Sequence, residues 1–391
     1  MWSSSDRSSL VSPFVRGARH HHTRSGYSHA SESGAAALLT WCAALGAQLS
    51  ADETDHETAL SLHLTVRHIL PTGNHLVPSK LIAVIGATGA QGGGLARAIL
   101  ADPSGEFSVR AVTRKATSDS ALTLARAGAE VIHADLNDVD SLVTAFSSAH
   151  GVFAMTNFWE HFSAETELQQ ATNIAEAAKR AGVAHVVWST LEDTRRFMSL
   201  DDPRMPTLQG RYKVPHLDAK GEADVEFTKR GVPTTNLLTS FYWDNFIHFG
   251  MGPARGEDGV LAITLPMGDR PLPGIAAEDI GRAAHAIFSA GDTYIGKTVG
   301  IAGEHLTGHE MSLAFSRTLG VPVHYNAIDA DTYRTFPFPG ADDLGNMFQF
   351  FHDFNDAFSA ARPLAASQAL VPGMQTFQQW LNANAARIPL A

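Results

Sequence analysis

The stretch from residue 80 to residue 101 constrains the fold more than any other. A β-branched apolar run at 81–85 leads into a loop with Gly86, Gly89 and Gly92, and a helical segment follows at 93–101. Such a short apolar run is typical of a parallel strand buried on both faces. A glycine loop between strand and helix suits a dinucleotide, because the helix N-terminus offers unpaired N–H groups to the pyrophosphate. A glycine-rich turn without a ligand is the less favoured alternative.

The same order of strand and helix recurs five times along the chain. We expect strands at 81–85, 107–113, 130–134, 151–155 and 184–189, and helices at 93–101, 119–127, 138–149, 164–180 and 219–230. This alternation predicts an α/β fold with a doubly wound parallel sheet, helices on both faces and the Rossmann strand order.

The remaining sequence divides into two further parts. After a strand at 234–238, short strands and turns rich in glycine and proline precede helices at 277–290, 308–319 and 373–386. We therefore expect a Rossmann domain at 79–240 and a smaller, interleaved α+β lobe at 241–391. Residues 1–78 are expected to form a disordered extension, because residues 1–34 are rich in Ser, Arg and His and cannot bury a core. A transit peptide is the less favoured interpretation of that segment.

Composition excludes several classes of function. The formal net charge is −11, which disfavours binding to the phosphates of nucleic acid. Cys42 is the only cysteine, so no internal disulfide forms, and a reducing compartment is expected: the cytoplasm, or also the nucleus. The longest apolar run, 35–49, is shorter than the roughly 20 residues of a membrane span. His305 and His309 lack a third ligand, so we expect no metal.

The end of the second strand predicts which dinucleotide binds. An NAD-binding fold usually carries Asp or Glu there, to hold the ribose 2′-hydroxyl. This chain has Arg114 and Lys115 instead. A guanidinium group suits a 2′-phosphate, so we expect NADP(H). A solvated strand end is the alternative interpretation of the two cations.

Several motifs resemble the NmrA-like family, an atypical branch of the short-chain dehydrogenases/reductases. In chain order they lie at 86–93, 152–160, 215–222, 241–245 and 338–348, and the resemblance covers about residues 80–385. It implies that Asp135 and Leu136 flank the adenine, that Thr156, Asn157 and Phe158 follow strand four beside the pyrophosphate, and that Lys220 reaches the nicotinamide ribose. Residues 242–245 would pass near the nicotinamide. Gln169 stands where a cofactor-binding lysine is expected. With the loop included, the predicted cofactor-binding residues are Gly86, Ala87, Thr88, Gly89, Ala90, Gln91, Gly92, Arg114, Asp135, Leu136, Thr156, Asn157, Phe158, Lys220, Tyr242, Trp243, Asp244 and Asn245.

The catalytic residues of this superfamily are only partly present. The resemblance implies a Tyr-x-x-x-Lys pair, in which the tyrosine passes a proton to the substrate. Lys220 matches the lysine, but His216 stands in place of the tyrosine, and Tyr212 is separated from Lys220 by Pro215. His216 is a weak candidate for the proton donor, because a surface or helix-capping histidine is the commoner case.

Two functions follow from this incomplete set. The resemblance favours an NADP(H)-sensing regulator that acts through contacts with a protein partner. The alternative is an NADPH-dependent reductase of a quinone, an enone or a similar small molecule, in which Lys220 assists and a water or His216 supplies the proton.

Overall fold

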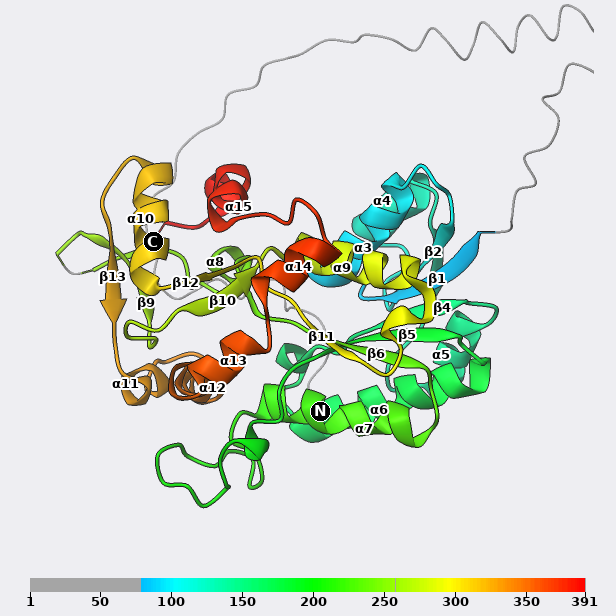
Figure 1. Cartoon of the computed structure of the whole chain (residues 1–391), viewed down its shortest axis with the longest axis horizontal. Helices are drawn as coiled ribbons and strands as arrows, with labels where there is room; N and C mark the ends of the chain where they lie inside the picture. Colours follow the sequence, from blue (N-terminus) through cyan, green and yellow to red (C-terminus); the bar gives the residue numbers. More distant parts are fainter. Residues whose placement is uncertain (1–78, 257, 391) are drawn as a thin grey trace, which may run out of the picture. The chain divides into compact units, whose positions relative to one another are not determined.

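A seven-stranded parallel sheet forms the centre of the computed structural model, which describes residues 79–256 and 258–390 (Figure 1). The strand order is β11-β6-β5-β4-β1-β2-β3. The strands are β1 (Lys80–Ile85), β2 (Phe107–Thr113), β3 (Glu130–His133), β4 (Gly151–Ala154), β5 (His185–Thr190), β6 (Thr234–Leu238) and β11 (Thr298–Gly300). The predicted doubly wound sheet and its Rossmann order are confirmed. Because β11 joins the sheet beside β6, residues on both sides of position 240 share one sheet.

Helices cover both faces of this sheet. Ile82 and Val84 of β1 pack against one helical layer, and Ala83 and Ile85 pack against the other, as alternation along a strand requires. The first layer contains α3 (Ala90–Ala101), α4 (Asp119–Arg126) and α9 (Ala277–Ser289), and the second contains α5 (Val139–Phe146), α6 (Ala164–Ala181) and α7 (Pro215–Lys229). Both faces of the sheet are therefore buried, which explains its continuous apolar strands.

Local signals explain several helix ends. The side chain of Asp138 accepts hydrogen bonds from the first turn of α5, and Gly182 ends α6 in the left-handed conformation, both as predicted. The helix predicted at 219–230 begins instead at Pro215, because proline suits the first helical position. This earlier start places His216 and Lys220 on one helix, one turn apart.

Aromatic side chains form the core of the second lobe. Trp243, Phe246, Phe315, Phe377 and Trp380 are almost fully buried there. No helix was predicted between residues 341 and 370, where the helix at Ala341–Asp353 contains Phe348, Phe350 and Phe351, and phenylalanine has lower helix propensity than leucine or alanine. The lobe comprises β7 (Phe241–Tyr242), α8 (Asn245–His248), β8 (Ala254–Arg255), β9 (Leu261–Leu265), β10 (Leu272–Ile275), β12 (Glu304–Leu306), α10 (Gly308–Leu319), β13 (Val323–Ala327), α11 (Ala330–Arg334), α12 (Ala341–Asp353), α13 (Asn355–Ala360), α14 (Leu364–Leu370) and α15 (Phe377–Asn384).

The predictions for residues 1–78 lie outside the described part of the chain. In residues 79–256 and 258–390, no helix has both the length and the apolar character that crossing a membrane requires.

Candidate functional site

The glycine loop joins β1 to α3 in the predicted manner. Gly86 has a φ of 67°, and a Cβ atom on Gly92 would lie 2.6 Å from the carbonyl oxygen of Gly86 and 2.7 Å from that of Ile85. Only glycine therefore fits at position 92. Gly89 is the N-cap of α3 and has no side chain to cover the N–H groups of the first turn. The loop thus fits a diphosphate group, which such an N-terminus binds through backbone N–H groups and the helix dipole.

Two cavities meet at this loop and share Thr88, Gly89 and Ala90. The smaller has a volume of about 230 Å³. Besides Gly86 of the loop, its wall includes four predicted cofactor residues from other parts of the chain: Arg114, Asp135, Leu136 and Asn157. Glu160 and Gln170 also line it. Gln169 does not line it, because its amide donates to Asn173 within α6. The structure therefore brings the residues predicted for the adenosine half together.

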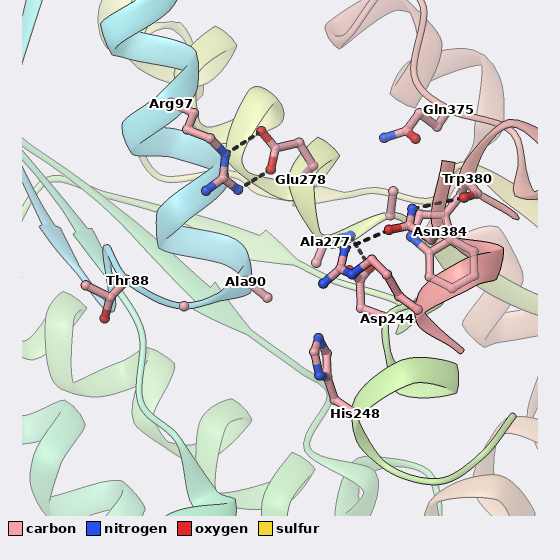
Figure 2. A pocket seen from close by; sticks show the side chains of 13 residues that line it. Thr88, Ala90, Arg97, Asp244, His248, Ala277, Glu278, Gln375, Trp380 and Asn384 are labelled. Carbon is pink, nitrogen blue, oxygen red and sulfur yellow. Dashed lines mark hydrogen bonds and ion pairs between the residues drawn. The ribbon is translucent and has the colours of Figure 1, made fainter. Parts of the chain in front are cut away.

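The larger cavity, of about 600 Å³, lies between the loop and the second lobe. Figure 2 shows Thr88 and Ala90 opposite Asp244 and His248, with the start of α9 beside them. Asp244 accepts a hydrogen bond from the backbone N–H of Ala277, the first residue of α9, at 2.9 Å. Asp244 thus lines the same cavity as the loop, and its place near the nicotinamide stays a prediction.

Arg114 forms an ion pair with an acidic residue that was not among the predicted site residues. Its Nη2 atom lies 2.7 Å from Oε1 of Glu160. Both side chains are exposed, at 57% and 41%, so this ion pair contributes little free energy. The guanidinium group can therefore exchange Glu160 for another anion in the same cavity.

Lys220 is anchored at the end of β4. Its Nζ atom donates to the carbonyl oxygen of Thr156 at 2.9 Å and to its hydroxyl at 2.8 Å, and lies 2.7 Å from Oε1 of Glu167. Lys220 and Thr156, both predicted, are thus in contact. Glu167 was not among the predicted site residues. Its position could have indicated its burial, because it lies three and four residues before the buried Gln170 and Ala171, on the same face of α6.

Glu167 is a buried carboxylate whose charge depends on Lys220. Burial is the largest single effect and raises the pKa of this carboxyl group, but the charge of Lys220 and the hydrogen-bonding contacts around the group together outweigh it. Together with contacts from His161 and Thr156, this charge lowers the pKa of Glu167 from 4.5 to about 2. Glu167 is therefore ionised at neutral pH, next to the ammonium group of Lys220.

Acid is expected to weaken the fold through Glu167. Its folded pKa lies below its unfolded pKa, so its stabilising contribution is complete above pH 4.5 and is lost as the pH falls towards 2. The full contribution is about 3 kcal/mol, of which about 2 kcal/mol is lost by pH 3. Urea unfolding at pH 7 and pH 3 measures this loss against the Lys220→Met/Glu167→Gln double variant. Equal losses in the two proteins would contradict the assignment.

His216 is buried, which corrects the expectation of a surface histidine. Its side chain is 8% exposed, and Nδ1 lies 2.6 Å from Oδ1 of Asp343 in α12. The rings of Phe158 and Trp159 lie 5.9 and 4.9 Å from the imidazole. Tyr212, in contrast, packs between two arginine side chains.

Other predicted residues contribute to the site less directly. The hydroxyl of Tyr242 accepts a hydrogen bond from Gln91 at 2.7 Å, and Gln91 accepts one from Ser189 at 2.8 Å. Asn245 begins α8. Trp243 is 1% exposed and packs in the core of the second lobe, so its side chain is not brought to the cleft, contrary to the expectation. The predicted residues that line neither cavity also include Gly92, Lys220, Tyr242 and Asn245, together with Ala87, Gln91, Thr156 and Phe158, which are buried.

Comparison with known proteins shows the family of the chain. The model of the NmrA-like family matches residues 78–381. The NmrA-like family domain-containing oxidoreductase FrzB of Cladobotryum sp is 28% identical, over 74% of this chain and 89% of its own. The corresponding oxidoreductase notA' of Aspergillus versicolor is 32% identical, over 60% and 68%. The structure of NmrA, a negative transcriptional regulator in complex with NAD, is 25% identical with a TM-score of 0.64, over 78% and 94%. The chain therefore belongs to the NmrA-like family.

Proposed function

We propose that this protein is an NADPH-dependent oxidoreductase that reduces a small conjugated carbonyl compound. The position of Lys220 carries the proposal: from α7 its side chain, which is 12% exposed, reaches the end of β4, and β4 is the strand next to β1, which leads into the glycine loop. The similarity to relatives named oxidoreductases supports it. The expectation of a regulator came from the family resemblance and was favoured by the missing tyrosine; a buried histidine with an acidic partner stands at the position of that tyrosine.

The dinucleotide would bind across both cavities. The diphosphate would be held by Thr88, Gly89 and Ala90, which the cavities share, and the adenosine half would lie in the smaller one. Lys220 would hold the nicotinamide ribose. When bound, NADPH supplies the hydride of the reaction.

Arg114→Asp is expected to weaken NADPH binding about ten- to a hundredfold and to change NADH binding little. A charge-assisted hydrogen bond to a phosphate is worth about 1.5–3 kcal/mol, and the aspartate adds repulsion. Titration with each cofactor measures both dissociation constants. As a matched control, Glu160→Gln releases Arg114 and should tighten NADPH binding alone. Equal losses for NADPH and NADH in Arg114→Asp would exclude the 2′-phosphate role.

The side chains near His216 favour a flat, apolar acceptor. Trp159 packs against Phe162 and Phe249, with ring centroids 5.8 Å apart in both cases. Phe162 and Phe249 are 39% and 48% exposed, which leaves aromatic surface for an aromatic or conjugated ring. The test is to add quinones, enones and aldehydes to the full chain with NADPH, and to follow the near-ultraviolet absorbance of the cofactor. Loss of the signal with one class would identify the acceptor.

A redox-sensing regulator is the second candidate, favoured by the similarity to NmrA, a negative transcriptional regulator. Such a protein must adopt different conformations with NADP⁺ and NADPH, because a ligand shifts only an equilibrium between states that it binds differently. Hydrogen exchange in the presence of each cofactor tests this. Stable NADPH across the acceptor panel, together with different exchange in the two complexes, would favour the regulator.

A further inference from the structure

His216 and Lys220 project from one face of α7. They are four residues apart, and side chains at this spacing lie next to each other, one above the other, on a helix. Lys220 points to the end of β4, where it contacts Thr156, and His216 contacts the rings that follow β4, Phe158 and Trp159. An acceptor placed beside Lys220 is therefore within one helical turn of the imidazole.

Asp343 determines how the imidazole of His216 is oriented. One carboxylate oxygen lies 2.6 Å from Nδ1 and the other accepts the backbone N–H of His216 at 3.2 Å. The side chain of Asp343 is 5% exposed. Because a carboxylate is an acceptor, Nδ1 carries a proton, and Nε2 is the nitrogen that can exchange one. Nε2 forms no hydrogen bond with any residue in the described part of the chain.

This arrangement matches what proton transfer from an imidazole requires. A carboxylate on Nδ1 holds the ring in one tautomer and stabilises the imidazolium, as in hydrolytic triads. Among the described residues, Asp343, from α12, is the charged group in contact with the ring, and Lys220 lies one turn further along α7. Lys220 is paired with Glu167, so Asp343 is the dominant charge at the imidazole. The segment after β4 packs the rings of Phe158 and Trp159 against the imidazole, of which 8% stays exposed.

We propose that His216 donates the proton to the acceptor and that Asp343 is its positioning residue. The inference rests on the proposed oxidoreductase function and deepens it. When hydride adds to the electrophilic carbon of a conjugated carbonyl compound, a π bond breaks and an electron pair moves to the oxygen. The oxygen then forms a bond to the proton of Nε2, and the electrons of the N–H bond stay on the neutral ring. The proton on Nδ1 stays on the ring throughout, in its hydrogen bond to Asp343. Solvent returns one proton to Nε2 in each turnover.

The test compares the full wild-type chain with His216→Gln and Asp343→Asn, in the presence of NADPH and the acceptor identified above. Turnover (kcat) is expected to fall about a hundredfold or more in His216→Gln and at least about tenfold in Asp343→Asn. The dissociation constant of NADPH should stay within about twofold, because neither side chain binds the cofactor. The wild-type kcat should decrease with rising pH, since the donor must be protonated, and His216→Gln should lose that dependence. Imidazole added to His216→Ala should restore part of the turnover.

His352→Gln is the matched control. His352 also lies in a His–Asp pair, with Nδ1 2.9 Å from Oδ1 of Asp353, but this pair is on the exposed part of α12. We expect His352→Gln to leave kcat and the pH profile unchanged. Asp343→Glu, which keeps the charge, should retain more turnover than Asp343→Asn and separates loss of the carboxylate from loss of the fold.

The outcomes separate the two proposals. If the wild type reduces no acceptor, the proposed function fails, and the proton donor fails with it. If the wild type is active but His216→Gln keeps its turnover and pH profile, only the assignment of the proton donor is overturned. A parallel loss of NADPH binding and turnover in both variants would show a structural role and would also overturn it.

Discussion

Lys220→Met is expected to reduce turnover by about a hundredfold or more and to lower the free energy of unfolding by about 3–5 kcal/mol. The stability effect arises because Glu167 is almost completely buried and Lys220 is its closest cation, 2.7 Å away. Methionine occupies a similar volume but leaves the carboxylate without a counter-charge. Its pKa would then rise, and part of the cost would appear as proton uptake on folding.

The Lys220→Met/Glu167→Gln double variant separates stability from function. Removing both charges should restore most of the free energy of unfolding, because a neutral amide can still accept the hydrogen bond from Thr156. It should not restore turnover or the affinity for NADPH, since the ammonium group is still absent. Urea unfolding and cofactor titration, performed on the same preparations, measure the two effects. If Lys220→Met retained both cofactor affinity and activity, the assigned role of Lys220 would be wrong.

Arg362→Met is expected to destabilise the fold by about 3–5 kcal/mol without a direct effect on the cofactor site. Arg362 is completely buried, and its guanidinium binds both carboxylate oxygens of Glu192, at 2.5 and 3.0 Å. It also donates to the carbonyl oxygens of Thr239 and Phe358. One side chain thus joins the segments that follow β5 and β6 to the C-terminal helices. Its loss leaves Glu192 and two carbonyl groups without their partner.

Chemical denaturation of three variants tests this interpretation. Arg362→Met/Glu192→Met should recover part of the loss, since no unpaired charge is left behind. The control is Arg180→Met, which breaks an exposed pair with Asp140 and should cost less than about 1 kcal/mol. A loss of that small size in Arg362→Met would show that the buried pair contributes no more than a surface pair.

Local patterns in the sequence predicted most of the central sheet. The strands at 107–113 and 234–238 have the predicted bounds, and α6 ends at Gly182 as expected. These features depend on neighbouring residues: continuous burial of a parallel strand, and a glycine that adopts the left-handed conformation. The helix predicted at 373–386 begins later in the structure, at Phe377. Thr376 and Gln379 form a capping box, which starts α15 at Phe377.

The sequence by itself determined the dinucleotide-type loop and the candidate residues at the strand ends, because the glycine spacing, the adjacent strand and the following helix lie within one short segment. Only the tertiary structure decided which charges meet: Glu160 with Arg114, Glu167 with Lys220, and Asp343 with His216. His216 and Asp343 are 127 residues apart in the chain, and no local pattern connects them. Such pairs form when segments that are far apart in the chain pack together, and their energies depend on burial and distance, which exist only in the folded chain.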